Sequence, residues 1–167
     1  RLASEGATVV ILDRPGDAEA GQKVAASING KFIGVDMSAP DAAATIIDFI
    51  KKELGGGVDI VVHNAGITRD KTIGNMDAAA WDMVISVNLN AIVTTNKALL
   101  AAGVIKENGR IISLSSTSGF AGNFGQTNYA TTKAGVIGYV RSLSQSTKDK
   151  KITVNAVAPG FIETAMT

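Results

Sequence analysis

Cysteine is absent from the 167 residues, and histidine occurs once, at position 63. The first absence excludes disulfides, thiolate zinc sites and a thiol nucleophile, and it is compatible with the cytosol. The second argues against a histidine-based metal site, so no metal is expected. Aromatic residues make up 5% and charged residues 19% of the chain, against 46% hydrophobic residues. That balance is typical of a globular domain and not of a disordered chain.

An excess of charge of either sign is also missing. The formal net charge of +1 gives no electrostatic reason to expect a nucleic acid or an anionic membrane as partner. No apolar run approaches the length of a membrane span, and no signal peptide is visible. We therefore expect a cytoplasmic protein. The length suits one domain with a real core, covering residues 1–167.

Short apolar runs rich in β-branched residues alternate along the chain with amphipathic segments. This alternation predicts buried parallel strands joined by helices. The segment 1–6 resembles the tail of a helix that ends at Gly6. Strands are expected at 7–12, 31–35, 58–62, 111–114 and 152–156, and helices at 17–28, 40–54, 77–102 with a break around Asn88, and 128–148.

The stretch 110–135 carries the clearest chemical signal. It is expected to contain a strand end, a polar Gly-rich loop, and a helix for which Thr127 and Asn128 can act as caps. Tyr129 and Lys133 are four residues apart, so a helix places them on one face. Ser116 follows the strand directly, at the end of a parallel sheet where ligands bind.

These three residue types together can deliver a proton. A free tyrosine hydroxyl has a pKa of about 10 and is a poor acid near neutrality. A neighbouring ammonium such as that of Lys133 lowers the pKa, and Tyr129 then becomes a usable proton donor to a carbonyl oxygen. Ser116 can hold the same oxygen by a hydrogen bond. The alternative interpretation is that Tyr129 and Lys133 are ordinary surface residues of a helix.

Other short motifs occur in a fixed order around this stretch. They are Asn64-Ala65-Gly66, Asn88, Ser116, the pair Tyr129 and Lys133, and Pro159-Gly160 followed by Ile162 and Thr164. Their order and spacing resemble those of the short-chain dehydrogenase/reductase family across nearly the whole chain. Within that family the sequences of these motifs are most similar to those of the 3-oxoacyl-acyl-carrier-protein reductases.

The resemblance implies an α/β fold: a Rossmann-like, doubly wound parallel sheet in a three-layer αβα arrangement. It implies that Tyr129 is the acid/base, that Lys133 tunes it, that Ser116 polarises the carbonyl, and that Asn88 holds a water that links Lys133 to solvent. It further implies that a nicotinamide cofactor binds along these loops. Asp36 and Met37 would contact the adenine, and Tyr129 and Lys133 the ribose. One wall of the cofactor site would consist of Asn64, Ala65 and Gly66, and the carboxamide would meet Pro159, Gly160, Ile162 and Thr164.

Asp13 bears on which cofactor is used. An acid at the tip of the second strand of such a sheet can accept hydrogen bonds from the adenosine ribose and repels a 2′-phosphate. NAD(H) is therefore favoured, while NADP(H) stays open because Arg14 lies beside the site. The alternative is that Asp13 only starts a turn.

Three polar residues have structural alternatives as well. Asp36 can cap the next helix, and Asn88 can be satisfied by backbone alone. His63 stands where the family usually has Asn, and we interpret it as a packed polar residue.

The resemblance also predicts what this chain lacks. The Gly-rich pyrophosphate turn and the first strand would precede Arg1, and the last strand and a substrate-covering helix would follow Thr167. We therefore expect the chain to be part of a longer polypeptide. Because the first strand lies between those ending at Asp13 and Asn64, its absence would split the sheet and leave two edges unpaired.

The expected activity is NAD(P)H-dependent reduction of a 3-oxoacyl thioester, carried by acyl carrier protein or CoA, to the 3-hydroxyacyl form. The alternatives are a reductase or dehydrogenase of another secondary alcohol or ketone, such as a 3-hydroxyacyl-CoA, a sugar or a steroid, and a non-catalytic nucleotide-binding module. The family resemblance also implies a homo-oligomer, a dimer or a tetramer.

Overall fold

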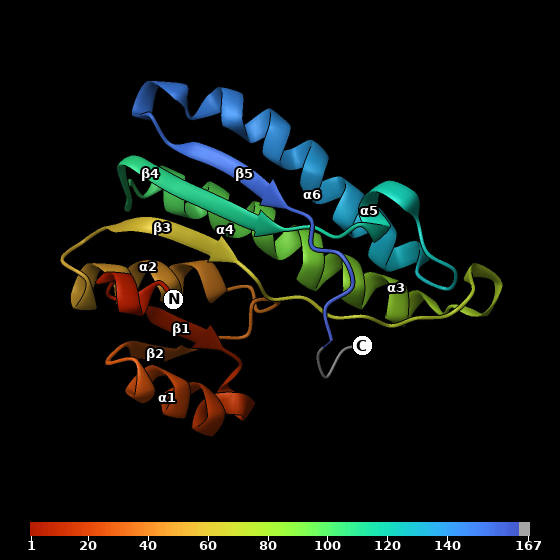
Figure 1. Ribbon diagram of the computed structural model, residues 1–167, viewed down its shortest axis with the longest axis horizontal. Helices are drawn as coiled ribbons and strands as arrows, with labels where there is room; N and C mark the ends of the chain where they lie inside the picture. The colour runs from red at the N-terminus through yellow and green to blue at the C-terminus, as the bar shows by residue number, and fades with distance from the viewer. Residues whose placement is uncertain (164–167) are drawn as a thin grey trace.

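The computed structural model describes residues 1–163. Strands and helices alternate along the described chain, as the hydrophobic pattern predicts (Figure 1). The strands are β1 (Val10–Asp13), β2 (Lys31–Gly34), β3 (Val58–His63), β4 (Ile105–Leu114) and β5 (Thr153–Val157). The helices are α1 (Ala18–Ser27), α2 (Ala42–Glu53), α3 (Ala78–Ile85), α4 (Ala91–Ala101), α5 (Ser118–Ala121) and α6 (Thr127–Ser146).

The strands form two separate parallel sheets. One sheet pairs β1 with β2, and the other has the order β3–β4–β5. β1 and β3 are each an edge strand, and the sheets lie one above the other in Figure 1, where the described residues 1–163 place no strand between β1 and β3. The predicted parallel α/β sheet is confirmed, and so is its predicted division at this place.

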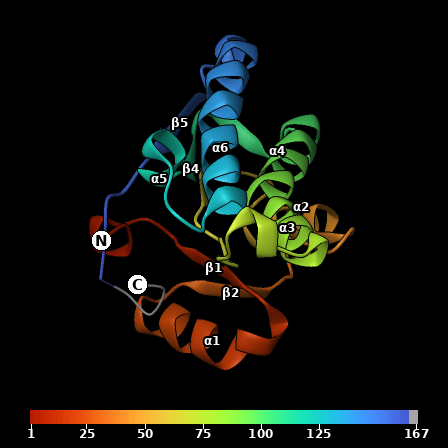
Figure 2. The same cartoon turned by 90° about the vertical axis from the view of Figure 1, so that its right-hand side faces the viewer.

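The hydrophobic core belongs to the three-stranded sheet. Helices α2, α4 and α6 pack with β3, β4 and β5, whereas α1 lies against β1 and β2 at the other end of the molecule (Figure 2). The buried members of the core are Ile50, Ile92, Leu99, Val104, Ile105, Ile111, Val136, Val140, Ile152 and Val154.

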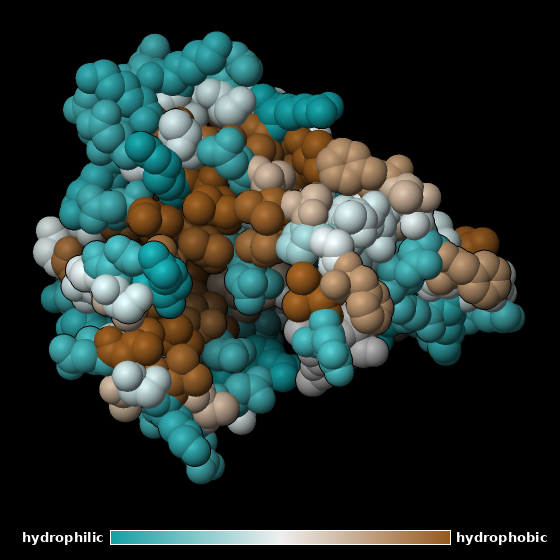
Figure 3. All heavy atoms as spheres, viewed as in Figure 1, coloured by the Kyte–Doolittle hydropathy of each residue, from teal (hydrophilic) through white to brown (hydrophobic). Residues whose placement is uncertain are grey.

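The opposite face of the three-stranded sheet is open in the described part of the chain. Successive side chains of a strand point to opposite faces, so Ile60 and Val62 lie on the face away from the core. Both are 44% exposed, and Val157 of β5 is 48% exposed. Apolar side chains gather on the side of the molecule seen in Figure 3. Here the apolar runs form strands, but only one face of them is covered.

The long helical segment 78–101 changes its winding in the middle. A π-helical turn, Ser86–Asn90, separates α3 from α4 and contains the fully buried Asn88, so the predicted break is confirmed. The combined helix has 24 residues and passes a test of length and apolarity for a membrane span. The prediction that no stretch approaches that length was therefore wrong. Such a test is also passed by core helices, and this one buries Asn88 and Asn96 against the rest of the fold.

Most boundaries differ from the sequence prediction by one to three residues, and β1 begins at Val10 instead of residue 7. β4 begins at Ile105 and not at 111, because the polar residues 106–109 continue the strand through an irregular register, with Asn108 at φ 60°. The loop after β4 contains the short helix α5. α6 begins at Thr127 with Gln126 as its N-cap residue and no side-chain capping bond, so the expected capping by Thr127 or Asn128 was wrong.

Candidate active site

Lys133 is fixed at the centre of the site. It lies one helical turn after Tyr129 on α6, and its Nζ is 5.5 Å from the centroid of the Tyr129 ring. Nζ also donates a hydrogen bond of 2.7 Å to the carbonyl oxygen of Leu114, the last residue of β4. Only 4% of Lys133 is exposed. The predicted juxtaposition of Tyr129 and Lys133 on one face of a helix is confirmed.

Burial changes the acid–base properties of Lys133. Because removal from water disfavours the ammonium, the pKa of Lys133 falls to about 8. The group is still mostly charged at pH 7, but its proton is far more easily lost than that of an exposed lysine. Lys133 can therefore exchange a proton near neutral pH.

The turn that carries Ser116 is bound to the start of α6. The Ser116 Oγ accepts a bond of 3.1 Å from the Ser118 backbone N–H, and the Ser118 Oγ lies 3.2 Å from Oε1 of Gln126. A Cβ added to Gly119 would lie 2.8 Å from the carbonyl carbon of Lys133, closer than real Cβ atoms come. Glycine is thus required for α5 to approach α6 at Lys133, and this contact sets the position of Ser116.

Asn88 connects the π-helical turn to the segment after β3. Its Oδ1 accepts a bond of 2.8 Å from the Ile67 N–H, and its Nδ2 donates one of 2.9 Å to the Ile67 carbonyl. A Cβ placed on Gly66 would lie 3.4 Å from Asn88 Oδ1 and 3.6 Å from Lys133 Nζ. The backbone of Gly66 therefore lies beside the side chains of both Asn88 and Lys133. Asn88 is satisfied by backbone, as the structural alternative expected, and it also lies beside Lys133.

The two acids expected at the adenosine end lie in the other sheet. Asp13 ends β1, and its Oδ1 accepts a bond of 2.8 Å from the Arg14 N–H. The Arg14 guanidinium pairs at 2.7 Å with the carboxylate of Asp17. Asp36 follows β2 and accepts bonds from the Ser38 hydroxyl and N–H, which lower the pKa of Asp36. Asp13 and Asp36 are both exposed.

The remaining expected contacts lie on loops at the carboxyl ends of β3 and β5. Asn64 and Ala65 are exposed, and Met37 after β2 is half-buried. The expected contact of Asn64 with a cofactor stays a prediction. The carbonyl oxygen of Pro159 accepts a bond of 3.2 Å from the Thr117 N–H, which brings the loop of Pro159, Gly160 and Ile162 beside the Ser116 turn. Thr164 lies outside the described residues.

Asn128 is a positioning residue that the sequence analysis treated only as a cap. It is fully buried, and its Nδ2 donates a bond of 3.1 Å to the Arg69 carbonyl while its Oδ1 accepts one of 2.7 Å from the Tyr129 N–H. The only signal in the sequence was its place directly before Tyr129. Ser115 was missed in the same way, and its Oγ donates a bond of 2.7 Å to the Lys133 carbonyl.

His63 is a packed polar residue, as predicted. Its Nε2 lies 2.7 Å from Oδ1 of Asn96 on α4, and the side chain is 8% exposed. Burial lowers the pKa of His63, so the ring is neutral near pH 7. The contact anchors the end of β3, immediately before Asn64, to the core helix.

Comparison with known proteins identifies the group to which this arrangement belongs. The family model described as short chain dehydrogenase matches residues 1–167. The chain belongs to this family. The short-chain dehydrogenases that it resembles include an acetoacetyl-CoA reductase from Allochromatium vinosum, 41% identical over the whole chain and 70% of that protein.

Two further relatives carry the name 3-oxoacyl-[acyl-carrier-protein] reductase. The protein from Vibrio cholerae is 44% identical over 83% of the chain and 57% of its own length. The protein from Aquifex aeolicus is 42% identical over the whole chain and 68% of its own length. The chain therefore spans between 57% and 70% of these three short-chain dehydrogenases.

Proposed function

We propose that the protein reduces a 3-oxoacyl thioester to the 3-hydroxyacyl thioester with a reduced nicotinamide cofactor. The single observation that carries the proposal is the buried Lys133, held by Leu114 next to the Tyr129 ring and facing Gly66. The names of the relatives support the same substrate class, since acetoacetyl-CoA and 3-oxoacyl carrier protein are both 3-oxoacyl thioesters.

The residues around Gly66 fit a flat ligand. With no side chain at Gly66, the space beside the Lys133 ammonium and Asn88 stays open to a ligand that approaches along the backbone. When bound, the nicotinamide supplies the hydride for carbon 3 of the substrate. Lys133 would hydrogen-bond the nicotinamide ribose, and the loop 159–162 would lie against the carboxamide.

The protein's own residues would handle the proton and the carbonyl oxygen. Ser116 donates a hydrogen bond to that oxygen, which draws electrons away from carbon 3. As hydride arrives at carbon 3, the oxygen takes the phenolic proton of Tyr129, and the products are an alcohol and a tyrosinate. The Lys133 ammonium stabilises the tyrosinate and returns a proton to it, and Asn88 supports a water that reloads Lys133.

We propose NAD(H) as the preferred cofactor, with NADP(H) as the alternative. The exposed carboxylate of Asp13 at the tip of β1 would repel a 2′-phosphate. Arg14 could accommodate such a phosphate, but it is engaged by Asp17 at 2.7 Å. Asp13→Ala should therefore lower the ratio of NADH to NADPH kcat/KM by about tenfold. Asp48→Ala on α2 is a matched control that should leave the ratio unchanged, and an unchanged ratio in Asp13→Ala would contradict the ribose role.

The activity itself is tested by following oxidation of NADH and NADPH by full-length protein with a short 3-oxoacyl thioester. We expect turnover in the wild type and a loss of about 10²-fold in Ser116→Ala, because removal of one oxyanion donor costs about that much. Ser142→Ala, at an exposed position of α6, serves as the control. Wild-type protein that binds nicotinamide nucleotide without turning over this substrate or another ketone would favour a non-catalytic binding module. Preference for a sugar or steroid ketone would favour the other alternative.

We also propose a cytoplasmic homo-oligomer, a dimer or a tetramer that packs the long helices 78–101 and 127–146 against those of other subunits. Part of the surface of the first helix is apolar and open to solvent, for example Met83 at 46% exposure. Size-exclusion chromatography with light scattering on full-length protein tests this assembly.

A further inference from the structure

A buried polar cluster lies at the end of β3, and no step of the proposed reaction uses it. His63 is the last residue of β3, Asn96 lies on α4, and Ser113 is the register partner of His63 in β4. Asn96 and Ser113 are fully buried, and His63 is nearly so. Because Oδ1 of Asn96 can only accept, His63 donates from Nε2 across the 2.7 Å that separate the two atoms.

This cluster is a poor device for stability. In the described part of the chain, Nδ2 of Asn96 and Oγ of Ser113 are buried without a hydrogen-bond partner. Burial raises the pKa of Tyr139 and the nearby Asn96 side chain offsets part of that rise, yet no hydrogen bond closes between Tyr139 and Nδ2. An unpaired buried donor costs about 1–3 kcal/mol, so apolar side chains of the same shape would stabilise this core better. The bond between His63 and Asn96 is better explained by the position that it gives to the end of β3.

The chain after His63 is anchored twice to one helical segment. His63 bonds to Asn96, and both backbone groups of Ile67 bond to Asn88. The two asparagines lie eight positions apart on the helix 78–101, which is about 12 Å along a helix axis. Four residues of extended chain span at most about 14 Å, so the segment between the anchors has little slack. Figure 1 shows the chain after β3 running alongside this helix.

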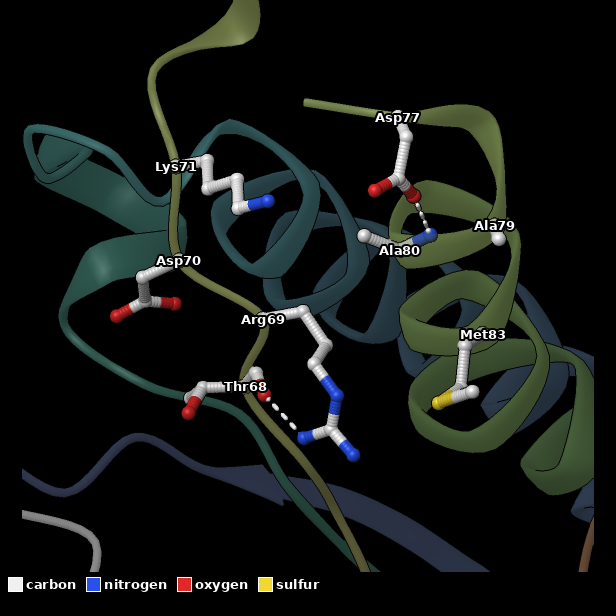
Figure 4. Close-up of a pocket in the computed structure, with 8 residues that line it drawn as sticks. All are labelled: Thr68, Arg69, Asp70, Lys71, Asp77, Ala79, Ala80 and Met83. Atoms are coloured by element: carbon white, nitrogen blue, oxygen red, sulfur yellow. Dashed lines mark hydrogen bonds between the residues drawn. The ribbon is translucent and has the colours of Figure 1, made fainter. Parts of the chain in front are cut away.

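The stretch between the anchors, residues 64–66, is the one expected to line the cofactor. Its first two side chains are exposed, and Gly66 lies beside the ammonium of Lys133. Beyond Ile67 the chain continues as the loop 68–71, which lines a pocket together with α3 (Figure 4). Loss of the first anchor would therefore free the backbone that faces the proposed ligand, while the second anchor stays in place.

We propose that His63 and Asn96 are positioning residues for the nicotinamide cofactor. Their bond fixes where residues 64–66 leave β3, and the backbone of these residues is thereby presented to the ligand. The inference rests on the proposed function, from which it takes the ligand. His63 and Asn96 are buried and act only through that backbone. Without their bond the cofactor itself would have to order residues 64–66, and such ordering lowers affinity.

The test measures binding of the cofactor and not only turnover. Full-length protein is titrated with NADH, and with NADPH if that binds more tightly. His63→Leu removes the donor and should raise the dissociation constant about tenfold, as should Asn96→Ala, which removes the acceptor. His63→Gln keeps a side-chain N–H near the place of Nε2 and should stay within about threefold of the wild type. The double variant His63→Leu/Asn96→Ala should bind no more weakly than either single variant, because the two residues act as one pair.

A purely structural role would lower stability and leave the affinity of the folded protein unchanged. Thr147→Val is the matched control, because the buried Thr147 Oγ1 donates a bond of 2.9 Å to the carbonyl of Ile152, just before β5 and so at the opposite ends of the strands. This variant should lose stability and keep the wild-type dissociation constant. In His63→Leu the KM for the cofactor should rise about tenfold, with kcat at saturating cofactor within about threefold of the wild type.

Hydrogen exchange of the ligand-free protein tests the anchor without ligand or activity. Backbone amides of residues 64–67 should exchange faster in His63→Leu and in Asn96→Ala than in the wild type. An unchanged dissociation constant in these folded variants overturns this inference alone, and Asn96→Ala decides if His63→Leu does not fold. A wild-type protein that binds no nicotinamide nucleotide overturns the proposed function instead.

Discussion

The two sheets contain similar strands in unequal surroundings. β1 and β3 are both short runs of β-branched residues that end in a polar side chain, yet the cluster of buried hydrophobic residues belongs to the sheet of β3. In the first forty residues the buried hydrophobic side chains are Ala25 and Val35. The comparison shows that an apolar run determines strand formation, whereas burial depends on which strands and helices lie beside it.

The same division separates the chemistry. Tyr129, Lys133, Ser116 and Asn88 all belong to the region with the packed core, which explains how their positions are fixed. Asp13 and Asp36, which we propose for the adenosine end of the cofactor, belong to the β1–β2 region. The residues proposed for proton transfer are thus positioned by one core, whereas those proposed for adenosine binding lie in the smaller sheet region.

The largest effect is expected at the buried amine of the core region. Lys133→Met keeps a similar length but removes the ammonium next to Tyr129, and kcat should fall by about 10³-fold. Melting of Lys133→Met should stay cooperative, because a buried methionine fills the same space. Retention of more than a tenth of wild-type kcat would remove Lys133 from the mechanism.

Lys133→Met should also change how the free energy of unfolding depends on pH. The folded chain lowers the pKa of Lys133 from 10.5 to about 8, so between these pH values the unfolded chain binds more protons than the folded one. The wild-type free energy of unfolding should therefore rise as pH increases through this window, relative to Lys133→Met. Parallel curves for the two proteins in urea titrations at pH 8 and pH 10 would contradict the assigned burial of the charge.

A pair of isoleucines tests the difference between the sheets directly. Ile111 in β4 is fully buried, whereas Ile11 in β1 is half-buried. In the polypeptide of residues 1–167, Ile111→Ala should cost about 3 kcal/mol of unfolding free energy and Ile11→Ala about 1 kcal/mol. Denaturant melts of both variants measure this difference. Equal costs would mean that β1 is packed as tightly as β4.

The smallest effect is expected at His63. Because burial lowers the pKa of His63 below 6.5, the unfolded chain binds more protons as pH falls below about 6.5, and stability is lost there. Between pH 7 and pH 5 the wild type should lose about 1 kcal/mol more than His63→Asn. Since His63 is the only histidine of the sequence, the same pH dependence in both proteins would show that the loss comes from other groups.

Much of the fold could be predicted because its signals are local. Strand and helix periods, the i to i+4 spacing of Tyr129 and Lys133, and the break at Asn88 all lie within short windows of sequence. The division of the sheet was also predictable, because family topology places one strand between β1 and β3. The beginning of β4 was not, since residues 106–109 resemble a turn and form an irregularity between the pairs Val58–Ile105 and Ile60–Arg110.

The supporting contacts of the site were beyond the sequence for a different reason. Asn128 bonds to Arg69 across 59 residues, and the Ser115 hydroxyl bonds to the Lys133 carbonyl across 18. Gly119 must be glycine because of a backbone from another helix, which no local pattern contains. Residue types that carry chemistry are visible in a sequence, whereas the residues that hold them are defined by tertiary contacts.

The central claim is that a tyrosine beside a buried amine supplies the proton. The chain offers its own control, because it has two tyrosines, both on α6, of which only Tyr129 lies against Lys133. We predict that Tyr129→Phe lowers kcat for a 3-oxoacyl thioester by about 10³-fold, and that Tyr139→Phe leaves kcat within about twofold. Turnover by Tyr129→Phe equal to that of Tyr139→Phe would contradict the account.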